Sequence, residues 1–305
     1  MIHRMHQHEA LLTDGVSASD ATDALLHDLG QSRARTRPRG RPFVTLAYAQ
    51  SVDGSISIAR GQRSALSGPE SLRFTHALRA GHDGILVGVG TVVADDPELR
   101  VRLVDGRDPQ PIIVDSHLRT PVGAKLLAQM GRQPWIGTTQ SSPPANPVDG
   151  SGRAPAAGGT RIHAVASAAA NDPRDVGGCE RRSRIEGRGA RILACEPHDN
   201  GWVDLSDLLR QLHAGGIEHL MVEGGARIIT SFLEARLVDY VAVTIAPIFM
   251  GGLSAVGRMN RPGAAHGTAG APGSTGSSIP GLRRWISARL GHDLVISGEI
   301  AWPES

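Results

Sequence analysis

Asp83-Gly-Ile-Leu-Val-Gly-Val-Gly-Thr-Val-Val-Ala-Asp-Asp-Pro97 is the stretch that decides the fold. Residues 85–87 form a short apolar run, which is typical of a strand buried on both faces of a parallel sheet. Gly88 and Gly90 interrupt the run, and residues 91–94 can begin a short helix. Backbone N–H groups at such a helix start, together with the helix dipole, favour an anion such as a nucleotide phosphate. Gly88-x-Gly90 indicates little by itself, because the third glycine of the dinucleotide fingerprint is absent.

The composition limits the classes of protein to consider. A chain of 305 residues suffices for one large domain or two small ones, and its net charge of +2 gives no argument for nucleic acid. No apolar run approaches the length of a membrane span, and the first residues lack a signal peptide's apolar core, so we expect a cytoplasmic protein. Cys179 and Cys195 stand far apart, which indicates neither a disulfide framework nor a zinc ribbon.

Residues 1–41 form an N-terminal extension that we expect to be flexible. Residues 19–29 can form a short helix. The arginines that follow, up to Arg41, alternate with proline and glycine, which is typical of a solvated linker. We favour a flexible tail over RNA binding, because only local charge supports the latter. The histidines among the first eight residues have no acid or cysteine that would complete a metal site.

Strands and helices alternate over residues 42–302, the folded domain. We expect strands at 43–49, 85–87, 111–115, 135–138, 191–194, 219–222 and 239–246, and helices at 69–80, 205–214 and 226–235. Low-complexity insertions interrupt them at about 141–189, with a strand-like segment at 161–166, and at about 252–280. Residues 285–288 and 293–297 form a terminal hairpin. The pattern predicts an α/β fold: a mostly parallel central sheet with helices on both faces and a C-terminal antiparallel hairpin.

A second glycine turn, Glu223-Gly224-Gly225, follows the strand at 219–222 and leads into the helix at 226–235. Sheets of this kind bind ligands at the carboxyl ends of their strands, where both glycine turns lie. The coincidence favours a nucleotide site. An ordinary Rossmann dehydrogenase is disfavoured, because neither a third glycine nor the fingerprint acid follows Gly90.

Four stretches together resemble the riboflavin-pathway pyrimidine reductases. They are Val44-Thr-Leu-Ala-Tyr-Ala-Gln-Ser-Val-Asp-Gly54, Gly84 to Pro97 as quoted above, Pro111-Ile-Ile-Val-Asp-Ser116 and Met221-Val-Glu-Gly-Gly-Ala226. The resemblance covers residues 42–252 apart from the insertion. It implies a dihydrofolate-reductase-like fold, NADPH as cofactor and a homodimer.

The deaminase signatures and the sequences of two segments distinguish the subtypes of this family. The common bacterial form carries a zinc deaminase with His-x-Glu and Pro-Cys-x-x-Cys signatures, and this chain has neither. Residues 1–41 are expected to be too few for such a domain. Tyr48-Ala-Gln-Ser51 and Arg63-Ser-Ala-Leu-Ser67 look more like the stand-alone fungal and archaeal form, which acts before deamination. Fungal relatives usually carry threonine where Ala47 stands.

The resemblance implies a reaction on 2,5-diamino-6-ribosylamino-4(3H)-pyrimidinone 5′-phosphate. The ribosylamino ring opens to an imine, and hydride from NADPH reaches the sugar C1′ to give a ribityl chain. The protein mainly positions the reactants. The substrate phosphate requires cations.

Candidate substrate residues come from the resemblance: Arg63, Arg79, Leu99, Arg102 and Glu223. A carboxylate at Glu223 could accept hydrogen bonds from ring amino groups or the ribose, whereas a purely structural role would be that of an acid at a helix start. Glu223 and Asp53 are the catalytic candidates. Asp53 is either a proton source near the imine or a structural acid of its turn, and both interpretations stay open.

The resemblance also gives the candidate cofactor residues: Ala49, Gly88, Gly90, Thr91, Asp95, Ser116, Gly224, Gly225, Ala226 and Arg227. A missing Cβ lets the backbone approach a pyrophosphate. Thr91 can donate its hydroxyl to a phosphate, and Asp95 either binds a ribose hydroxyl or orders its loop. Ser116 with Arg119 could recognise the adenosine 2′-phosphate, or form a simple Asp-Ser turn. No further ligands accompany Asp95 and Asp96, so we predict no metal.

Three other interpretations stay open beside this one. The chain could act on the deaminated 5-amino-6-(5-phosphoribosylamino)uracil, or on a related pyrimidine or pterin of secondary metabolism, for which Ala47 and the insertions leave room. It could also be a nucleotide-binding subunit without turnover, against which the presence of Arg79, Glu223 and both glycine turns counts. No nucleic acid or membrane is expected as a partner.

Overall fold

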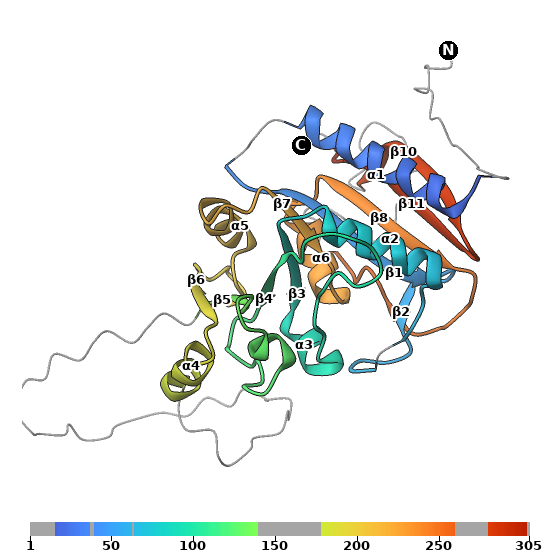
Figure 1. Ribbon diagram of the computed structural model, residues 1–305. Coiled ribbons are helices and arrows are strands. Elements are labelled where there is room, and N and C mark those ends of the chain that lie inside the picture. Colours follow the sequence, from blue (N-terminus) through green and yellow to red (C-terminus); the bar gives the residue numbers. More distant parts are fainter. Residues whose placement is uncertain (1–15, 37–39, 63, 140–177, 260–279, 304–305) are drawn as a thin grey trace, which may run out of the picture.

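The computed structural model describes residues 16–36, 40–62, 64–139, 178–259 and 280–303. Its centre is a nine-stranded sheet in the order β10-β11-β8-β1-β7-β3-β4-β5-β6 (Figure 1). The strands are β1 (Phe43–Ser51), β3 (Gly84–Gly88), β4 (Gln110–Val114), β5 (Trp135–Thr138), β6 (Arg191–Ala194), β7 (His219–Val222), β8 (Tyr240–Ala246), β10 (Gly281–Leu290) and β11 (Asp293–Ala301).

The strand directions confirm the expected fold class. β1 pairs in parallel with β7 and β8, and β3 pairs in parallel with β7 and β4. β11 runs antiparallel to β8, and β10 runs antiparallel to β11. The carboxyl ends of the central parallel strands therefore share one edge of the sheet, and the C-terminal hairpin extends its far side.

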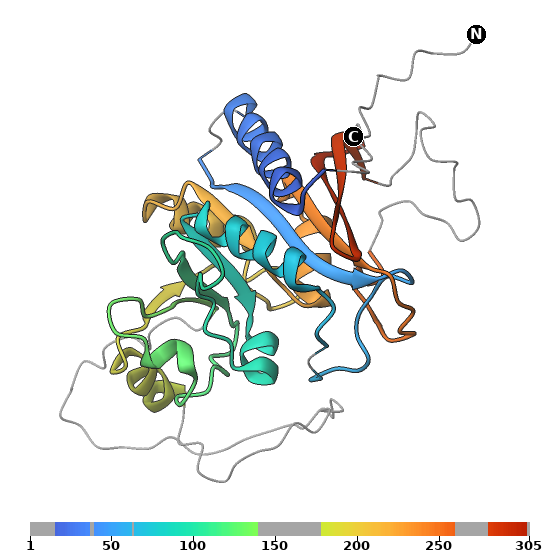
Figure 2. The same cartoon turned by 45° about the vertical axis from the view of Figure 1, so that its right-hand side comes forward.

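Helices cover both faces of the sheet, as the turned view in Figure 2 shows. They are α1 (Ala18–Arg35), α2 (Pro69–Ala80), α3 (Val89–Asp95), the 3₁₀ helix η1 (Lys125–Ala128), α4 (Gly178–Glu186), α5 (Leu205–Ala214) and α6 (Ala226–Glu234). The predicted helices at 69–80, 205–214 and 226–235 agree with α2, α5 and α6 within one residue. Among the described residues, no helix has both the length and the apolar character needed to cross a membrane.

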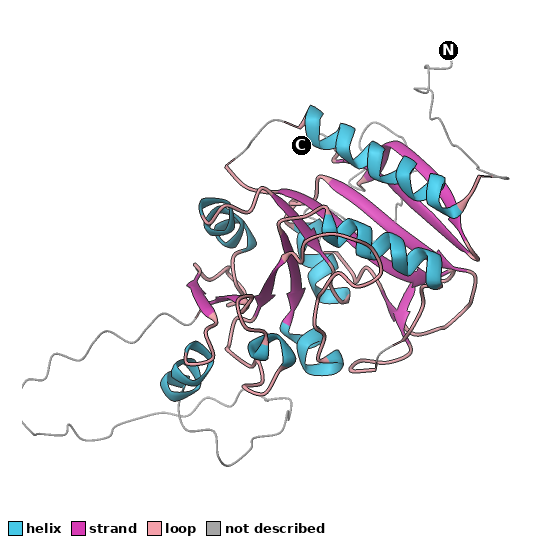
Figure 3. Ribbon diagram, viewed as in Figure 1, coloured by secondary structure: helices cyan, strands magenta, loops and turns pink. Residues whose placement is uncertain are grey.

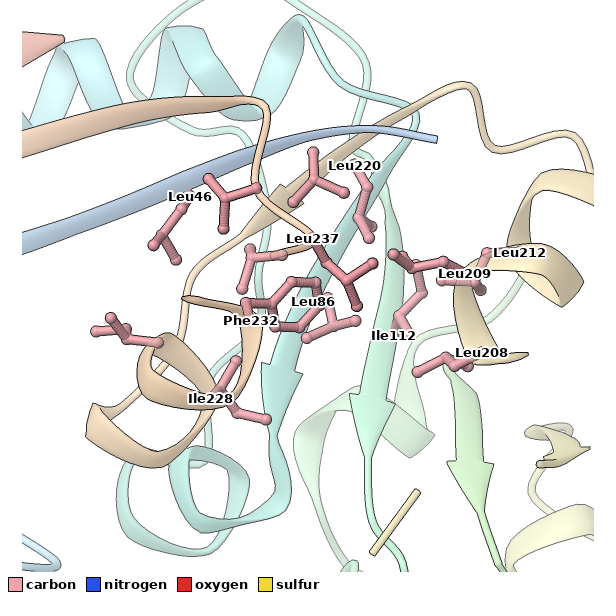
Figure 4. Packing of buried hydrophobic residues seen from close by; sticks show 14 of the residues in the cluster. Leu46, Leu86, Ile112, Leu208, Leu209, Leu212, Leu220, Ile228, Phe232 and Leu237 are labelled. Carbon is pink, nitrogen blue, oxygen red and sulfur yellow. The ribbon is translucent and has the colours of Figure 1, made fainter. Parts of the chain in front are cut away.

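Alternate residues of β3 enter different hydrophobic clusters, as expected for a strand covered on both sides. Leu86 packs with side chains of α5 and α6, whereas Ile85 and Val87 pack with α3, η1 and α4. Figure 4 shows part of the first cluster, where α5 and α6 cover β1, β3 and β4. The apolar run 85–87 is thus buried on both faces, as the sequence indicated.

A two-stranded antiparallel sheet of β2 (Ser55–Ser57) and β9 (Leu253–Ser254) lies beside the main sheet. The sequence analysis gave neither strand. β9 falls in the segment expected to be a low-complexity insertion, and it is too short to leave a pattern. Its pairing partner is almost two hundred positions away in the chain, so only tertiary structure brings the two strands together.

The N-terminal helix is longer and better packed than expected. The predicted helix at 19–29 is part of α1, which continues to Arg35 and lies along the hairpin of β10 and β11 (Figure 3). Ala21, Leu25 and Leu29, spaced by four residues, occupy one helix face and are buried against α2 and the hairpin.

Two arginines, one at the end of α1 and one after it, correct the expectation of a solvated linker. Arg35 donates two hydrogen bonds to Glu299, at 3.0 and 2.9 Å. Arg41 forms a bidentate pair with Asp239, at 2.6 and 2.8 Å. These arginines pack through charge-assisted contacts with distant segments, which local composition does not reveal. Residues 37–39 lie outside the described part of the chain.

Part of the first predicted insertion, residues 141–189, is also structured. Its last segment forms α4, whose Ile185 is fully buried in the cluster with α3 and η1. The arginine-rich sequence of α4 hides this single apolar anchor, which is why the sequence predicted a loop. The strand expected at 161–166 lies outside the described residues, and the division of the chain at residue 41 stays a prediction.

Candidate active site

The two glycine turns meet at the carboxyl edge of the sheet. β3 and β7 are parallel neighbours with Leu86 opposite Val222, and the Glu223 N–H donates to the Leu86 carbonyl oxygen at 2.9 Å. A Cβ added at Gly225 would lie 3.8 Å from Thr91 Oγ1. The start of α6 and the first turn of α3 therefore lie side by side, in agreement with one shared ligand site.

Two of the four glycines are required by packing within the chain. A Cβ at Gly224 would lie 2.6 Å from Cγ2 and 2.7 Å from Cβ of Ile228, and a Cβ at Gly88 would lie 2.7 Å from Ile228 Cγ1. Close-packed interiors do not accommodate such approaches. The contact that requires glycine at these positions is therefore Ile228, whereas the sequence analysis had attributed it to a cofactor.

Packing does not require the other two glycines. A Cβ at Gly90 would meet no atom within 4 Å, and a Cβ at Gly225 would make only an ordinary contact with Thr91. Gly225 has φ −75°, a conformation open to any residue. No described residue fills the space beside these two glycines. A pyrophosphate approaching the backbone N–H groups would occupy it, so these residues fit a nucleotide cofactor.

Arg79 and Glu223 form the central ion pair of the site. Arg79 Nε and Nη2 donate to the two Glu223 oxygens at 2.9 and 2.6 Å. Arg79 Nη1 also donates to the Arg100 carbonyl oxygen at 3.0 Å. The arginine side chain is 10% exposed and the glutamate 29% exposed. A planar guanidinium thus links α2, the turn after β7 and the loop after α3, while one partner stays accessible from solvent.

The loop after α3 carries two further candidate substrate residues. Leu99 is buried, has φ 53°, and its carbonyl oxygen accepts a hydrogen bond from Arg132. The Arg102 side chain is 56% exposed and pairs with Glu98 at 3.1 Å. Its backbone N–H donates to Nδ1 of His76, one turn before Arg79 on α2. The structure therefore gathers Arg79, Leu99, Arg102 and Glu223, whereas Arg63 lies outside the described residues.

Asp53 binds the turn between β1 and β2 to the loop after β8. Its carboxylate accepts hydrogen bonds from the hydroxyls of Ser51 and Ser55, at 2.6 and 2.9 Å, and from the N–H groups of Met250 and Gly251, at 2.9 and 2.8 Å. These donors, that of Ser51 foremost, hold the pKa of Asp53 far below its ordinary value. Of the two open interpretations, this arrangement favours the structural acid over the proton source.

Ser116 follows β4 and is buried. Its Oγ accepts the Val203 N–H at 3.0 Å, and its carbonyl oxygen accepts the hydroxyl of Thr139 at 2.8 Å. Arg119 is half exposed, with Nε 3.9 Å from Asp115 Oδ1. The arrangement favours the turn interpretation for Ser116 and leaves Arg119 as the accessible cation of this segment.

The remaining candidates take their expected positions along the elements. Asp95 is the last residue of α3, and Ala226 is the first of α6. Asp96 caps α3 in a left-handed conformation with φ 40°, before Pro97. Ala49 lies in β1 opposite Thr244 of β8.

The sequence did not predict the two rings that lie near Arg227 of α6, those of Trp202 and His117. The Arg227 guanidinium lies 4.6 Å from the ring centroid of Trp202, which in turn lies 5.4 Å from the His117 ring. His117 and Arg227 each directly follow a quoted stretch, but Trp202 is far from all four. No sequence spacing therefore indicated that the three side chains meet. Within the described residues, no group of three or more His, Cys, Asp or Glu side chains could hold a metal ion.

Residues 42–265 match the RibD C-terminal domain model. The chain belongs to this family. A 2,5-diamino-6-ribosylamino-4(3H)-pyrimidinone 5′-phosphate reductase from Methanothermobacter thermautotrophicus is 37% identical over 218 residues, covering 70% of this chain and 82% of the relative. One of the same name from Candida glabrata is 30% identical over 231 residues, covering 70% and 77%.

A solved structure of a similar protein has the same fold. The solved structure of the Saccharomyces cerevisiae riboflavin biosynthesis reductase Rib7 superposes with a TM-score of 0.57 at 26% identity, covering 90% of this chain and all of that one. The family and the fold predicted from the four stretches are therefore confirmed. Helix α1 and the hairpin of β10 and β11 lie outside the matched residues 42–265.

Proposed function

We propose that this protein reduces the ribosyl side chain of 2,5-diamino-6-ribosylamino-4(3H)-pyrimidinone 5′-phosphate to the ribityl form, with NADPH as reductant. The observation that carries the proposal is the ion pair of Arg79 and Glu223 beside the two glycine turns. The names of the archaeal and fungal relatives support the substrate class.

Glu223 is proposed to recognise the amino-substituted pyrimidine. Both of its oxygens accept from Arg79, which fixes the plane of the carboxylate. Each oxygen keeps a second lone pair for an N–H donor. The ion pair holds the acceptor in one orientation before the substrate arrives, so little reorganisation is needed on binding.

Arg102 is proposed to bind the substrate phosphate. Its guanidinium is more than half exposed, and its ion-pair partner among the described residues is the accessible carboxylate of Glu98. Such a surface pair contributes little, so exchange of the carboxylate for a doubly charged phosphate is favourable. Arg63 remains a second candidate from the family resemblance.

The cofactor is proposed to lie along Gly90, Thr91, Gly225 and Ala226, and it would supply hydride to the sugar C1′. The open space beside the two glycines supports this placement. The first backbone N–H groups of α6 are free of partners within that helix and can donate to a phosphate. Arg119 is proposed to select NADPH over NADH, because it is the exposed cation next to Ser116.

The test measures the absorbance of NADPH as it is oxidised, with the diamino compound and its deaminated counterpart supplied in parallel. Turnover with the diamino compound is expected. Preference for the deaminated compound would show that it, and not the diamino compound, is the substrate. NADPH binding without turnover of either compound would overturn the riboflavin assignment.

Two variants connect this activity to the ion pair. Arg79→Ala and Glu223→Gln are each expected to lower kcat/KM by about 10²-fold or more, because removing one charge leaves its partner unpaired. Arg289→Ala, an exposed arginine of β10 bonded to Gly291 O, is the matched control. Activity of both variants at the control level would contradict the proposed site.

We also propose a cytoplasmic homodimer, with neither nucleic acid nor membrane as partner. The family resemblance supports the dimer, and the nearly balanced charge of the chain supports the absence of nucleic acid. Light scattering of the purified protein gives the test, with a mass twice that of one chain as the expected result.

A further inference from the structure

His76 is a buried residue of α2 to which the sequence analysis assigned no role. Its ring is almost inaccessible, at 2% exposure. The backbone N–H of Arg102 donates to its Nδ1 at 2.9 Å. A ring nitrogen that accepts a hydrogen bond carries no proton, so the ring is neutral with its hydrogen on Nε2.

Helix α2 contacts the loop after α3 at two points. Residues three apart on a helix share a face, so His76 and Arg79 meet the loop together. Arg79 donates to the Arg100 carbonyl oxygen at 3.0 Å, and His76 accepts from the Arg102 N–H. The backbone of residues 100–102 is thereby fixed on both its acceptor and its donor side.

This loop needs such support. Leu99 has φ 53°, a conformation that disfavours a leucine by roughly 1 kcal/mol or more. Such a conformation persists only where surrounding contacts determine it. The Val101 N–H donates to Asp108 Oδ1 at 2.6 Å, so the segment after Leu99 has a second donor-side hydrogen bond. Without the contact at His76, the Arg102 N–H itself would lose its partner, and the exposed Arg102 side chain would start from a less defined backbone position.

We propose that His76 is a positioning residue for substrate binding, which holds the Arg102 backbone so that the Arg102 guanidinium meets the phosphate of the pyrimidine. This role rests on the proposed function in assigning Arg102 to the phosphate. His76 itself does not touch the substrate, and it acts only as a neutral acceptor.

The electrostatic surroundings keep the ring neutral. Burial lowers the pKa of His76 below its ordinary value, and the positive charges of Arg79 and Arg102 lower it further. Glu223 and Asp108 act in the opposite direction and do not outweigh them. The depressed pKa means that the folded protein favours the neutral ring. The contribution of the neutral ring to the free energy of unfolding is therefore complete above the ordinary pKa of about 6.5. It is lost as the pH falls from there through the lowered pKa of the folded protein.

The test compares His76→Asn with His76→Leu in steady-state kinetics. Asparagine can place an oxygen near the position of Nδ1 but cannot titrate, whereas leucine removes the acceptor at similar volume. His76→Leu is expected to raise KM for the phosphorylated pyrimidine by about tenfold, because it leaves the part-buried Arg102 N–H unpaired. KM for NADPH and kcat should change by less than about threefold. His76→Asn should restore KM, and Leu72→Ala, an exposed position of α2, is the control for the helix.

The pH profile separates positioning from a loss of stability. In the wild type, KM for the pyrimidine should rise only as the pH falls through the lowered pKa of His76, which lies below the ordinary value of about 6.5, and this rise should be smaller in His76→Asn. The substrate phosphate titrates identically in both, so the difference between them belongs to the histidine. Exchange of the Arg102 amide hydrogen gives a readout without substrate: slow in the wild type and His76→Asn, faster in His76→Leu.

Two outcomes overturn different statements. An unchanged KM for the pyrimidine in His76→Leu, or equal loss in both histidine variants, overturns the role of His76 alone. Failure of the wild type to reduce either pyrimidine overturns the proposed function, and with it the assignment of His76 to phosphate binding.

Discussion

The turn after β3 and the turn after β7 contain the same residue type for different reasons. Each ends one of two neighbouring parallel strands, and each has two glycines. In each turn one glycine, Gly88 or Gly224, lies against Ile228, and the other, Gly90 or Gly225, has room for a Cβ. Two glycines therefore serve packing and two leave room for a ligand, a distinction that glycine spacing by itself does not make.

Gly224→Ala should have the largest effect on stability. The new Cβ would lie 2.7 Å from the Cβ of Ile228, an atom that no side-chain rotation can move. Relief requires a backbone shift, so we expect a loss of about 2–3 kcal/mol in the free energy of unfolding. Urea denaturation measures it, with Gly225→Ala as the control at the adjacent position. A loss no larger than that of the control would contradict the packing role.

Gly88→Ala should cost less, because its Cβ would meet Cγ1 and Cδ1 of Ile228, at 2.7 and 3.3 Å. These atoms can move by a change of rotamer. We expect a loss of about 1–2 kcal/mol by the same measurement.

A double-mutant cycle sharpens the explanation of both losses. Ile228→Ala alone should cost about 2–5 kcal/mol, because it removes a buried side chain. In that background, the cost of Gly88→Ala should fall by at least half, since the clashing atoms are gone. Strict additivity of the two substitutions would show that Ile228 is not the reason for glycine at this position.

Gly90→Ala should have the opposite sign. Gly90 lies in the first turn of α3 with free space around it, and alanine favours a helix by about 0.5–1 kcal/mol over glycine. We expect a protein that is slightly more stable but binds NADPH more weakly, because the methyl group fills the proposed phosphate space. Thermal unfolding and a fluorescence titration with NADPH measure the two effects. Unchanged affinity would remove Gly90 from the cofactor site.

Gly225→Ser is expected to have the smallest effect on stability. Gly225 is the N-cap of α6 without a side-chain hydrogen bond, and serine is the better cap by a few tenths of a kcal/mol. A gain in melting temperature together with a higher KM for NADPH would show that Gly225, like Gly90, leaves room for the cofactor. A gain in stability without a change in KM would break the comparison between the two turns.

The N-terminal helix shows where prediction from the sequence stopped. The predicted helix ended at residue 29, directly before Gly30, and glycine is a poor helix former. The helix continues because Arg33 donates to the Gly81 carbonyl oxygen at 2.8 Å and Arg35 pairs with Glu299. Tertiary contacts of this kind routinely override local propensity. The same reason explains α4, which a single buried isoleucine anchors.

The sequence by itself determined the features that depend on neighbours along the chain. The run 85–87 predicted a strand covered on both faces, the helix expected at 69–80 agrees with α2, and the strand ends followed by glycines predicted the edge where the two glycine turns meet. These are local because strand and helix periods repeat within a few residues.

Only the tertiary structure decided which side chains meet. Arg79 and Glu223 are 144 positions apart and pair because β7 lies next to β3 in the sheet. The contacts of Ile228 with Gly88 and Gly224 arise for the same reason, and His76 meets the backbone of Arg102 because α2 lies against the loop after α3. Contacts between distant segments depend on strand order and on which helix covers which face. No pattern within a single segment records these, because each segment forms the same local structure whatever partner lies beside it.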